Sequence, residues 1–350
     1  MPIIRSALTL ADLPSPPDGK TGFPWTGQSQ PLPDRLPDGS EYPRISVVTP
    51  SYNQGMFLEE TIRSVLLQGY PNLEYIIMDG GSTDNSVEII KKYEPYLAYW
   101  VSESDRGQSH ALNKGFHLAT GDLIGWQNSD DYYHSASFEK VAQLSNCHQE
   151  CDVFYGSTNY VDENGDFLKP YPVTDFDIHE LIPYPNICNQ SMFFRKGIFD
   201  NGDFIDESYQ HAMDTEFFMR LALKRYEFKF FPEIAGCYRI HSNTKMFQQT
   251  EVCIMDSLRI YKSLYKNADL PLSLRQKALW SFQRICINQF GESRLSLFHK
   301  TFRNLIELDG IAALNLELTI KYLVSLTGDR NVQTLKKASR ILTRRSTAVQ

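Results

Sequence analysis

The chain has 350 residues, 42% of them hydrophobic, which is enough for a domain with a sizeable core, with or without an appendage. No apolar run approaches the ~18–20 residues of a membrane-spanning helix, and the first residues lack a secretion-signal pattern, so we expect a cytoplasmic protein. The net charge of −7 combines an acidic body with a basic tail, which argues against a nucleic-acid-binding protein.

Residues 1–43 contain nine of the 18 prolines and are expected to form an extended arm that wraps the body or is partly disordered. Strands and helices joined by short links then alternate from Arg44. In chain order we expect strand 45–49, helix 56–68, strand 73–78, helix 82–93, strand 99–103, helix 109–119 and strand 123–126. This alternation predicts an α/β fold with a mostly parallel sheet and helices on both faces.

Beyond Tyr133 the alternation weakens. The further elements expected are strands at 152–156, 191–194 and 227–231 and a helix at 214–224. After residue 248 the pattern becomes helical to the end. We therefore expect three parts, namely the arm 1–43, a domain 44–248 and a helical extension 249–350.

The helical extension is basic. Residues 251–350 contain 16 Lys and Arg against 8 Asp and Glu, a net charge of +8 that leaves −15 for the rest of the chain. Such a tail is suited to peripheral contact with an anionic membrane on its cytoplasmic side. A solvated helix face is the alternative explanation of the same charges.

The six cysteines lack the spacing of a disulfide framework. Cys147, His148 and Cys151 suggest a metal site, but no second pair of ligands matches them. We expect free thiols in a reducing compartment.

Polar side chains follow three of the predicted strands, at 50–53, at 79–84 and at 128–131. Open α/β sheets bind ligands at the carboxyl ends of their strands. Asp130 and Asp131 would place two carboxylates there, which suits Mn²⁺ or Mg²⁺ carrying substrate phosphates. The alternative is that this Asp pair only caps a following helix.

Together these motifs resemble the family 2 glycosyltransferases, including those that build bacterial cell-surface polysaccharides and glycolipids. The likeness covers about residues 44–246 and includes the stretches 107–115 and 119–122. It implies a GT-A fold, a nucleotide-diphospho-sugar donor that is most often a UDP-sugar, and transfer with inversion to a glycan or lipid-linked acceptor.

The resemblance assigns a donor site to the first two strand ends. Asp79 would accept a hydrogen bond from uracil, with Pro50 and Tyr52 lining the pocket. Asp105 and Arg106 match positions that contact the nucleoside or diphosphate. The alternatives are a plain strand-to-helix turn after Asp79 and a surface ion pair for Arg106.

The resemblance also assigns metal ligands. Asp130 and Asp131 match the family's acidic tip, with one near the ribose and the other on the metal. Many relatives carry Asp where this chain has Asn128, whose carbonyl could still bind metal or ribose. His241 matches a late histidine that helps to hold metal or phosphate, although a lone histidine is usually structural.

Inverting transfer requires a base that takes the acceptor's proton. Asp214 matches the family's acidic motif and inherits this role, with Glu216 as the fallback. Helix capping is the structural alternative for Asp214. Asn189 and Gln190 resemble the acceptor-side loop, where amides can bind sugar hydroxyls.

The loop after the first predicted strand bears on two other enzyme classes. A sugar nucleotidyltransferase needs a basic, glycine-rich loop after the first strand, and a dinucleotide oxidoreductase needs Gly-x-Gly-x-x-Gly there; neither follows Thr49. A catalytically inactive sugar-nucleotide-binding module remains open.

Overall fold

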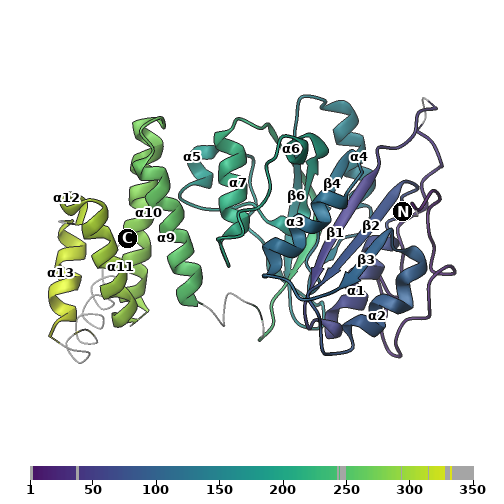
Figure 1. The fold of residues 1–350 in the computed structure, drawn as a ribbon, viewed down its shortest axis with the longest axis horizontal. Helices are drawn as coiled ribbons and strands as arrows, with labels where there is room; N and C mark the ends of the chain where they lie inside the picture. The colour runs from purple at the N-terminus through teal and green to yellow at the C-terminus, as the bar shows by residue number, and fades with distance from the viewer. Residues whose placement is uncertain are drawn as a thin grey trace, which may run out of the picture. The chain divides into compact units, whose positions relative to one another are not determined.

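The computed structural model describes residues 3–36, 39–242, 244, 250–292, 294–313, 315–327 and 332. The chain forms two compact units, one of residues 1–181 and 185–247 and the other of residues 182–184 and 248–350 (Figure 1). The domain boundary expected at residues 248 and 249 lies outside the described residues.

The first unit is built on a sheet whose strands run in the order β3-β2-β1-β4-β8-β6-β9-β5, with β7 paired to β6. Their bounds are β1 Ile45–Ser51, β2 Leu73–Asp79, β3 Tyr99–Ser102, β4 Leu123–Trp126, β5 Tyr132–Tyr133, β6 Val153–Val161, β7 Phe167–Pro170, β8 Met192–Arg195 and β9 Phe228–Arg239. Strands β3, β2, β1 and β4 are mutually parallel, as are β6 and β9. Strands β8, β7 and β5 add the antiparallel pairings.

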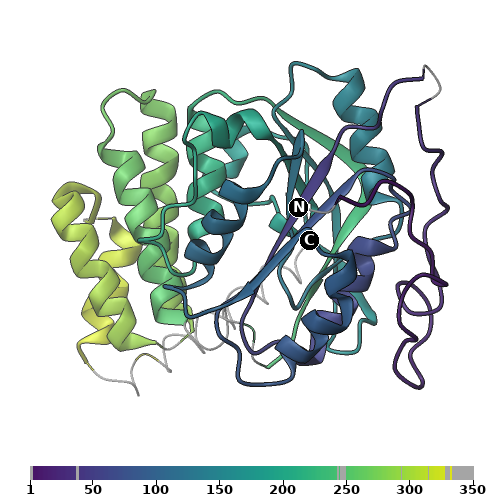
Figure 2. The same cartoon turned by 45° about the vertical axis from the view of Figure 1, so that its right-hand side comes forward.

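Helices cover both faces of this sheet, as the alternation predicted. They are α1 Gly55–Leu66, α2 Ser86–Tyr93, α3 Gln108–Leu118, α4 Ser137–Cys147, α5 Ile178–Leu181, α6 Lys196–Asp200 and α7 Met213–Leu223. Val47 belongs to the core shared with α1, whereas Val48 packs against Gly115 of α3. Successive side chains of a strand point to opposite faces, so α1 and α3 lie on opposite sides of β1. Figure 2 shows α3 from a second direction.

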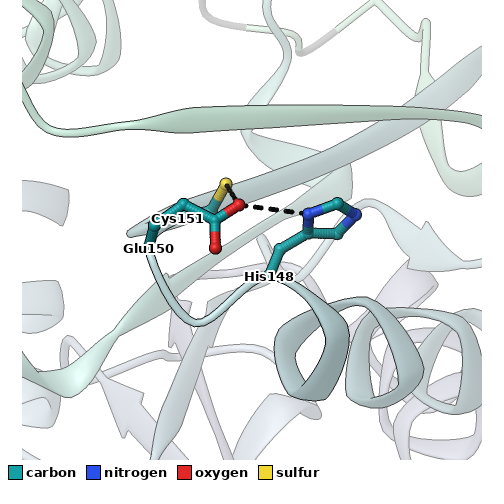
Figure 3. A group of neighbouring side chains, drawn as sticks. All are labelled: His148, Glu150 and Cys151. Carbon is teal, nitrogen blue, oxygen red and sulfur yellow. Dashed lines mark hydrogen bonds and ion pairs between the residues drawn. The ribbon is translucent and has the colours of Figure 1, made fainter.

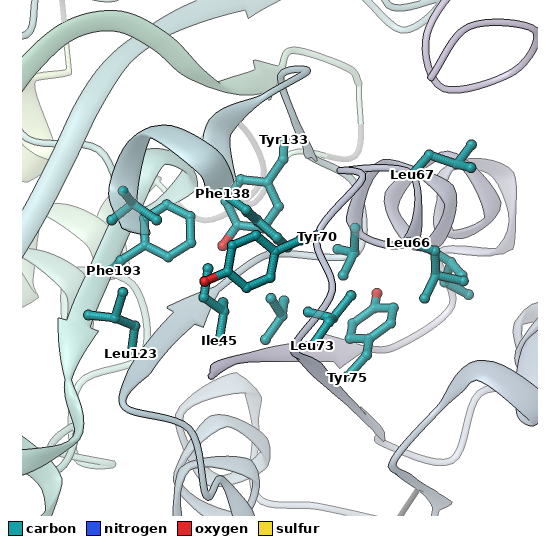
Figure 4. Close-up of a cluster of buried hydrophobic side chains, with 14 of the residues drawn as sticks. Ile45, Leu66, Leu67, Tyr70, Leu73, Tyr75, Leu123, Tyr133, Phe138 and Phe193 are labelled. Carbon is teal, nitrogen blue, oxygen red and sulfur yellow. The ribbon is translucent and has the colours of Figure 1, made fainter. Parts of the chain in front are cut away.

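The core lies between α1, α4 and the sheet (Figure 4). The described part of the N-terminal arm is packed against it, since Leu13, Trp25 and Tyr42 are buried. The buried guanidinium of Arg63 donates hydrogen bonds to the carbonyls of three arm residues, Pro14, Pro24 and Trp25. The arm was expected either to wrap the body or to be partly disordered, and its described residues wrap the body.

The last strand differs from the sequence prediction. Strand β9 does not end at Phe231 but continues past Pro232 to Arg239. Its pairing with β6 shifts register near Gly156 and Ser157, which accommodates the proline. The longer strand delivers Arg239 and His241 to the sheet edge where β4 ends.

The second unit is helical. It contains α9 Thr250–Lys266, α10 Leu272–Gly291, α11 Leu295–Leu308, α12 Gly310–Ala313 and α13 Leu316–Ser325. Phe282, Phe298 and Phe302 are buried among these helices. None of the helices in the described part of the chain is both long and apolar enough to cross a lipid bilayer.

Candidate active site

The carboxyl ends of β1, β2 and β4 meet at one edge of the sheet. Ser51 lies opposite Asp79 in the parallel register, and Val48 lies opposite Trp126. The three polar motifs that follow these strands are therefore neighbours. Parallel pairing is what joins segments about 25 to 80 residues apart in the sequence.

Asp79 organises the turn after β2. Its Oδ2 accepts hydrogen bonds from the backbone N–H of Gly81 at 3.1 Å, the N–H of Ser82 at 2.9 Å and the hydroxyl of Ser102 at 2.6 Å. Gly81 has φ +82°, a conformation that glycine adopts readily. Because residues 80–84 form this turn, α2 begins at Ser86 and not at Ser82 as the sequence suggested.

Gly80, in this turn, lies close to two of the predicted donor residues. A Cβ atom added at Gly80 would lie 2.7 Å from Oδ2 of Asp105 and 3.4 Å from the ring of Tyr52. Tyr52 is 61% exposed, so most of its ring is free to stack. Pro50 lies in β1 directly before this segment. The predicted donor residues Pro50, Tyr52, Asp79 and Asp105 are thus brought together.

Arg106 lies beside them but forms an ion pair. Its Nη2 is 2.7 Å from Oε2 of Glu207, and its side chain is largely exposed. The surface ion pair expected as the alternative for Arg106 is therefore present. A phosphate would have to compete with Glu207 for the guanidinium.

The acidic tip after β4 is held by Asn128. Its side-chain oxygen accepts hydrogen bonds from Trp126 Nε1 at 2.8 Å and Gln108 Nε2 at 2.7 Å, while its Nδ2 donates to Asp131 at 3.1 Å. Both ends of the amide are in use. Asn128 therefore orients the tip and its carbonyl is not open toward a ligand.

Asp131 is buried below the tip. Its Oδ1 accepts the backbone N–H of Arg239 at 2.8 Å, and its Oδ2 accepts Gln190 Nε2 at 2.7 Å. Burial, reinforced by the charge of Asp130, raises the pKa of Asp131 to about 8. Through these contacts Asp131 anchors the tip to β9 and to the turn before β8.

Asp130 is partly exposed and lies beside the buried His241. Its Oδ2 is 3.2 Å from Nε2 of His241, and the imidazole packs 4.6 Å from the ring of Phe57. One carboxylate oxygen and one imidazole nitrogen this close together could both bind a divalent cation whose other ligands are phosphate oxygens and water.

The other candidate metal group contains His148, Glu150 and Cys151 (Figure 3). One oxygen of Glu150 accepts from His148 Nδ1 at 3.2 Å and from Cys151 Sγ at 3.7 Å, so the three side chains satisfy one another. The group precedes β6, which runs parallel to β4, so it lies at the sheet edge away from Asp130. All six cysteines are free thiols.

Asp214 lies in the first turn of α7, partly buried. Its Oδ1 accepts the N–H of Thr215 at 2.6 Å, and burial raises its pKa. Burial and the nearby charges of Asp131, Asp130 and Asp214 raise the pKa of Tyr238. Asp214 and both aspartates of the tip are thus within electrostatic range of Tyr238.

Glu216 is engaged elsewhere. It forms a two-point ion pair with Arg220, at 2.8 and 3.0 Å, and Arg220 also binds Asp203. This network ties α7 to the segment before it.

The predicted acceptor residues lie in a buried turn before β8. Gln190 donates to Asp131 and therefore supports the acidic tip, while Nδ2 of Asn189 is buried without a hydrogen-bond partner. Sequence reasoning missed Arg239, which binds the tip, although it stands two residues before His241.

Comparison with known proteins identifies the fold and the family. Residues 46–208 match the model of "Glycosyl transferase family 2". An uncharacterized glycosyltransferase of Mycobacterium tuberculosis is 31% identical over 186 residues, 52% of this chain and 70% of that protein. The chain belongs to glycosyl transferase family 2. A PGL/p-HBAD biosynthesis glycosyltransferase of Mycobacterium bovis is 28% identical over 51% of this chain and 69% of its own length.

Solved structures agree in fold with this family 2 glycosyltransferase. S. aureus TarS in complex with UDP-GlcNAc has a TM-score of 0.63 at 18% identity, over 85% of this chain and 91% of TarS. Mannosyltransferase PcManGT from Pyrobaculum calidifontis, in complex with GDP-Man and Mn²⁺, has a TM-score of 0.54 at 16% identity, over 84% and 83%. The GT-A fold expected from the sequence is confirmed.

The protein is therefore an enzyme that transfers glycosyl groups. The family match ends at residue 208, before Asp214 and His241. For these two residues of the glycosyltransferase, it is the geometry of the site that bears on their function.

Proposed function

We propose that this glycosyltransferase moves a sugar from a UDP-sugar to a glycan or lipid-linked acceptor with inversion, assisted by Mn²⁺ or Mg²⁺ and with Asp214 as general base. The observation that carries the proposal is the facing pair of Asp130 Oδ2 and His241 Nε2, 3.2 Å apart at the edge where β1, β2 and β4 end. A diphosphate held there would point its sugar away from the site proposed for the nucleobase.

The donor's uracil would stack on Tyr52 and lie over Gly80, where a side chain would collide with Asp105. Asp79 accepts four hydrogen bonds, one of them from the Ser82 hydroxyl to Oδ1. It therefore fixes the turn beside the site proposed for uracil. The TarS complex with UDP-GlcNAc supports UDP as the nucleotide.

Asp130 and His241 would hold the cation, which when bound offsets the negative charge that builds on the departing diphosphate. Asp131 would set the tip from beneath, because its carboxylate is bound by Arg239 and Gln190. The PcManGT complex with Mn²⁺ supports divalent metal use on this fold.

In the transfer step the acceptor hydroxyl oxygen attacks the anomeric carbon and the carbon–oxygen bond to the diphosphate breaks. The hydroxyl proton passes to the Asp214 carboxylate. A pKa raised by burial makes this carboxylate a stronger base than an exposed aspartate. Glu216 is the weaker candidate, since Arg220 occupies both of its oxygens.

The acceptor side is proposed from charge and family. The net charge of +8 over residues 251–350 would draw the enzyme to an anionic membrane surface, where a lipid-linked acceptor resides. Assembly of bacterial surface polysaccharide or glycolipid fits such an acceptor.

The base assignment is tested by Asp214→Asn and its matched control Glu216→Gln. We expect Asp214→Asn to lower kcat by about 10²–10⁴-fold, because an amide cannot take the acceptor's proton. Donor affinity should be unchanged, and Glu216→Gln should keep most turnover. The measurements are UDP release from a panel of UDP-sugars with Mn²⁺, and calorimetric binding of the donor.

Normal turnover by Asp214→Asn would overturn the base assignment. A wild-type protein that binds donors but transfers no sugar, with or without Mn²⁺, would instead support the inactive binding module. Pyrophosphate released from a nucleoside triphosphate would indicate a nucleotidyltransferase.

A further inference from the structure

A buried ion pair lies beneath the acidic tip. Nη2 of Arg239, the last residue of β9, is 2.9 Å from Oε2 of Glu60 on α1, and the two side chains are 1% and 9% exposed. Removing two charges from water is costly, and such pairs often add little net stability. Fold stabilisation is therefore a weak explanation for a buried ion pair at this position.

The guanidinium of Arg239 holds the tip directly. Its Nε donates to the backbone carbonyl of Asp130 at 2.8 Å, and its backbone N–H donates to the Asp131 carboxylate at 2.8 Å. Its Nη1 donates to the carbonyls of Asp162 at 3.3 Å and Glu163 at 3.0 Å. One residue thus fixes both aspartates of the tip against the turn after β6.

The same side chain also fixes the histidine. The guanidinium lies 4.9 Å from the ring centre of Phe57, and Phe57 in turn packs 4.6 Å from the ring of His241. His241 follows Arg239 by only two residues. Both members of the Asp130–His241 pair are therefore placed relative to Arg239.

We infer that the Glu60–Arg239 ion pair is the positioning element that sets the separation of Asp130 and His241 and thereby the affinity of the site for the cation and diphosphate. The inference rests on the proposed function of that pair. Arg239 is almost wholly buried, so it acts through Asp130 and His241 and not by touching the donor. Glu60 holds the guanidinium in the orientation that its hydrogen bonds require.

The test separates positioning from fold stabilisation. Arg239→Met alone leaves Glu60 buried without a partner and should unfold at a lower temperature. The double variant Glu60→Met/Arg239→Met removes both charges and should regain thermal stability, because no buried charge is left unpaired. Its apparent Kd for Mn²⁺ in the presence of UDP should nonetheless rise about 10–100-fold, the usual effect of losing a residue that supports metal ligands.

Arg239→Lys gives a second reading should the double variant not fold. Lysine keeps the charge facing Glu60 but lacks the planar fork that also reaches the Asp130 carbonyl, so Mn²⁺ affinity should again fall. Arg63→Met is the matched control. Arg63 is as buried as Arg239 and lies on the same helix as Glu60, but it binds arm carbonyls and Tyr93. Its loss should therefore lower stability and leave the Mn²⁺ Kd unchanged.

Calorimetry with Mn²⁺ and UDP, alongside thermal unfolding, measures both quantities without turnover. A stable double variant or a folded Arg239→Lys with the wild-type Mn²⁺ Kd would overturn the inference. If the wild-type protein itself binds no Mn²⁺ with UDP, it is the proposed metal site that fails.

Discussion

Asp130 and Asp131 are adjacent in the sequence and have different surroundings. Asp131 is buried and bound by Arg239, Gln190 and Asn128, whereas Asp130 retains exposed surface and faces His241. The sequence motif could not say which carboxylate is buried, because β9 and the turn before β8 supply the partners of Asp131. Asp214 and Glu216 also differ in their surroundings, because Arg220 forms an ion pair with Glu216.

The pH dependence of activity follows from the surroundings of Asp214. Burial raises its pKa above the ordinary value of 3.8, and a general base works only when it is unprotonated. Activity should therefore be lost as pH falls through the raised pKa. A profile of kcat/KM against pH for the wild-type enzyme should show its acid limb above pH 3.8; a limb at or below that value would contradict the assignment.

At the level of elements, α3 is held close to the sheet by a glycine. A Cβ atom at Gly115 would overlap the side chain of Val48 on β1, whereas a Cβ at Gly197 in α6 meets nothing within 4 Å. Close packing matters here because α3 begins at Gln108, which binds Asn128 of the acidic tip. The spacing of α3 and β1 thus bears on the site.

Two alanine substitutions test this spacing. Gly115→Ala should lower the free energy of unfolding by about 1–3 kcal/mol through overpacking, although alanine favours helices. Gly197→Ala should raise it by up to about 1 kcal/mol, since only helix propensity changes. Urea unfolding of both variants measures the difference. Wild-type stability of Gly115→Ala would show that α3 can move away from β1 without cost.

At the level of the whole molecule, charge and exposed apolar side chains are unevenly distributed. The helical unit holds Ile311, Leu316 and Leu323, all of them more than half exposed, within a region of net charge +8. Exposed apolar residues beside basic ones are typical of surfaces that lie on anionic membranes. The body of the chain, at −15, would be repelled by the same lipids.

Vesicle binding tests this distribution. The enzyme should bind vesicles that contain anionic lipid and bind purely zwitterionic vesicles more weakly. Binding should weaken as salt rises from about 0.1 M to 1 M, because the screening length falls from about 10 Å to 3 Å. Co-sedimentation measures it, and reversing Lys336, Lys337, Arg344 and Arg345 to glutamate should weaken it. Equal binding to both vesicle types would exclude an electrostatic contact.

The sequence by itself determined the α/β alternation, the order of the polar motifs and the family, because hydrophobic periodicity and short motifs are local properties of a chain. It missed the helix α4, the short elements β5, β7, α5 and α6, and the continuation of β9 past Pro232, where pairing with β6 outweighs the local signal of a proline.

Only the tertiary structure decided which polar groups are engaged and which remain open. Gln190 and Arg239 reach Asp131 from 59 and 108 residues away, and Glu60 pairs with Arg239 across 179 residues. No local pattern encodes such contacts. Burial then makes adjacent carboxylates unequal, since desolvation acts on the group that the fold covers. The sequence identifies the motifs, whereas tertiary packing determines which of their side chains are buried and bound.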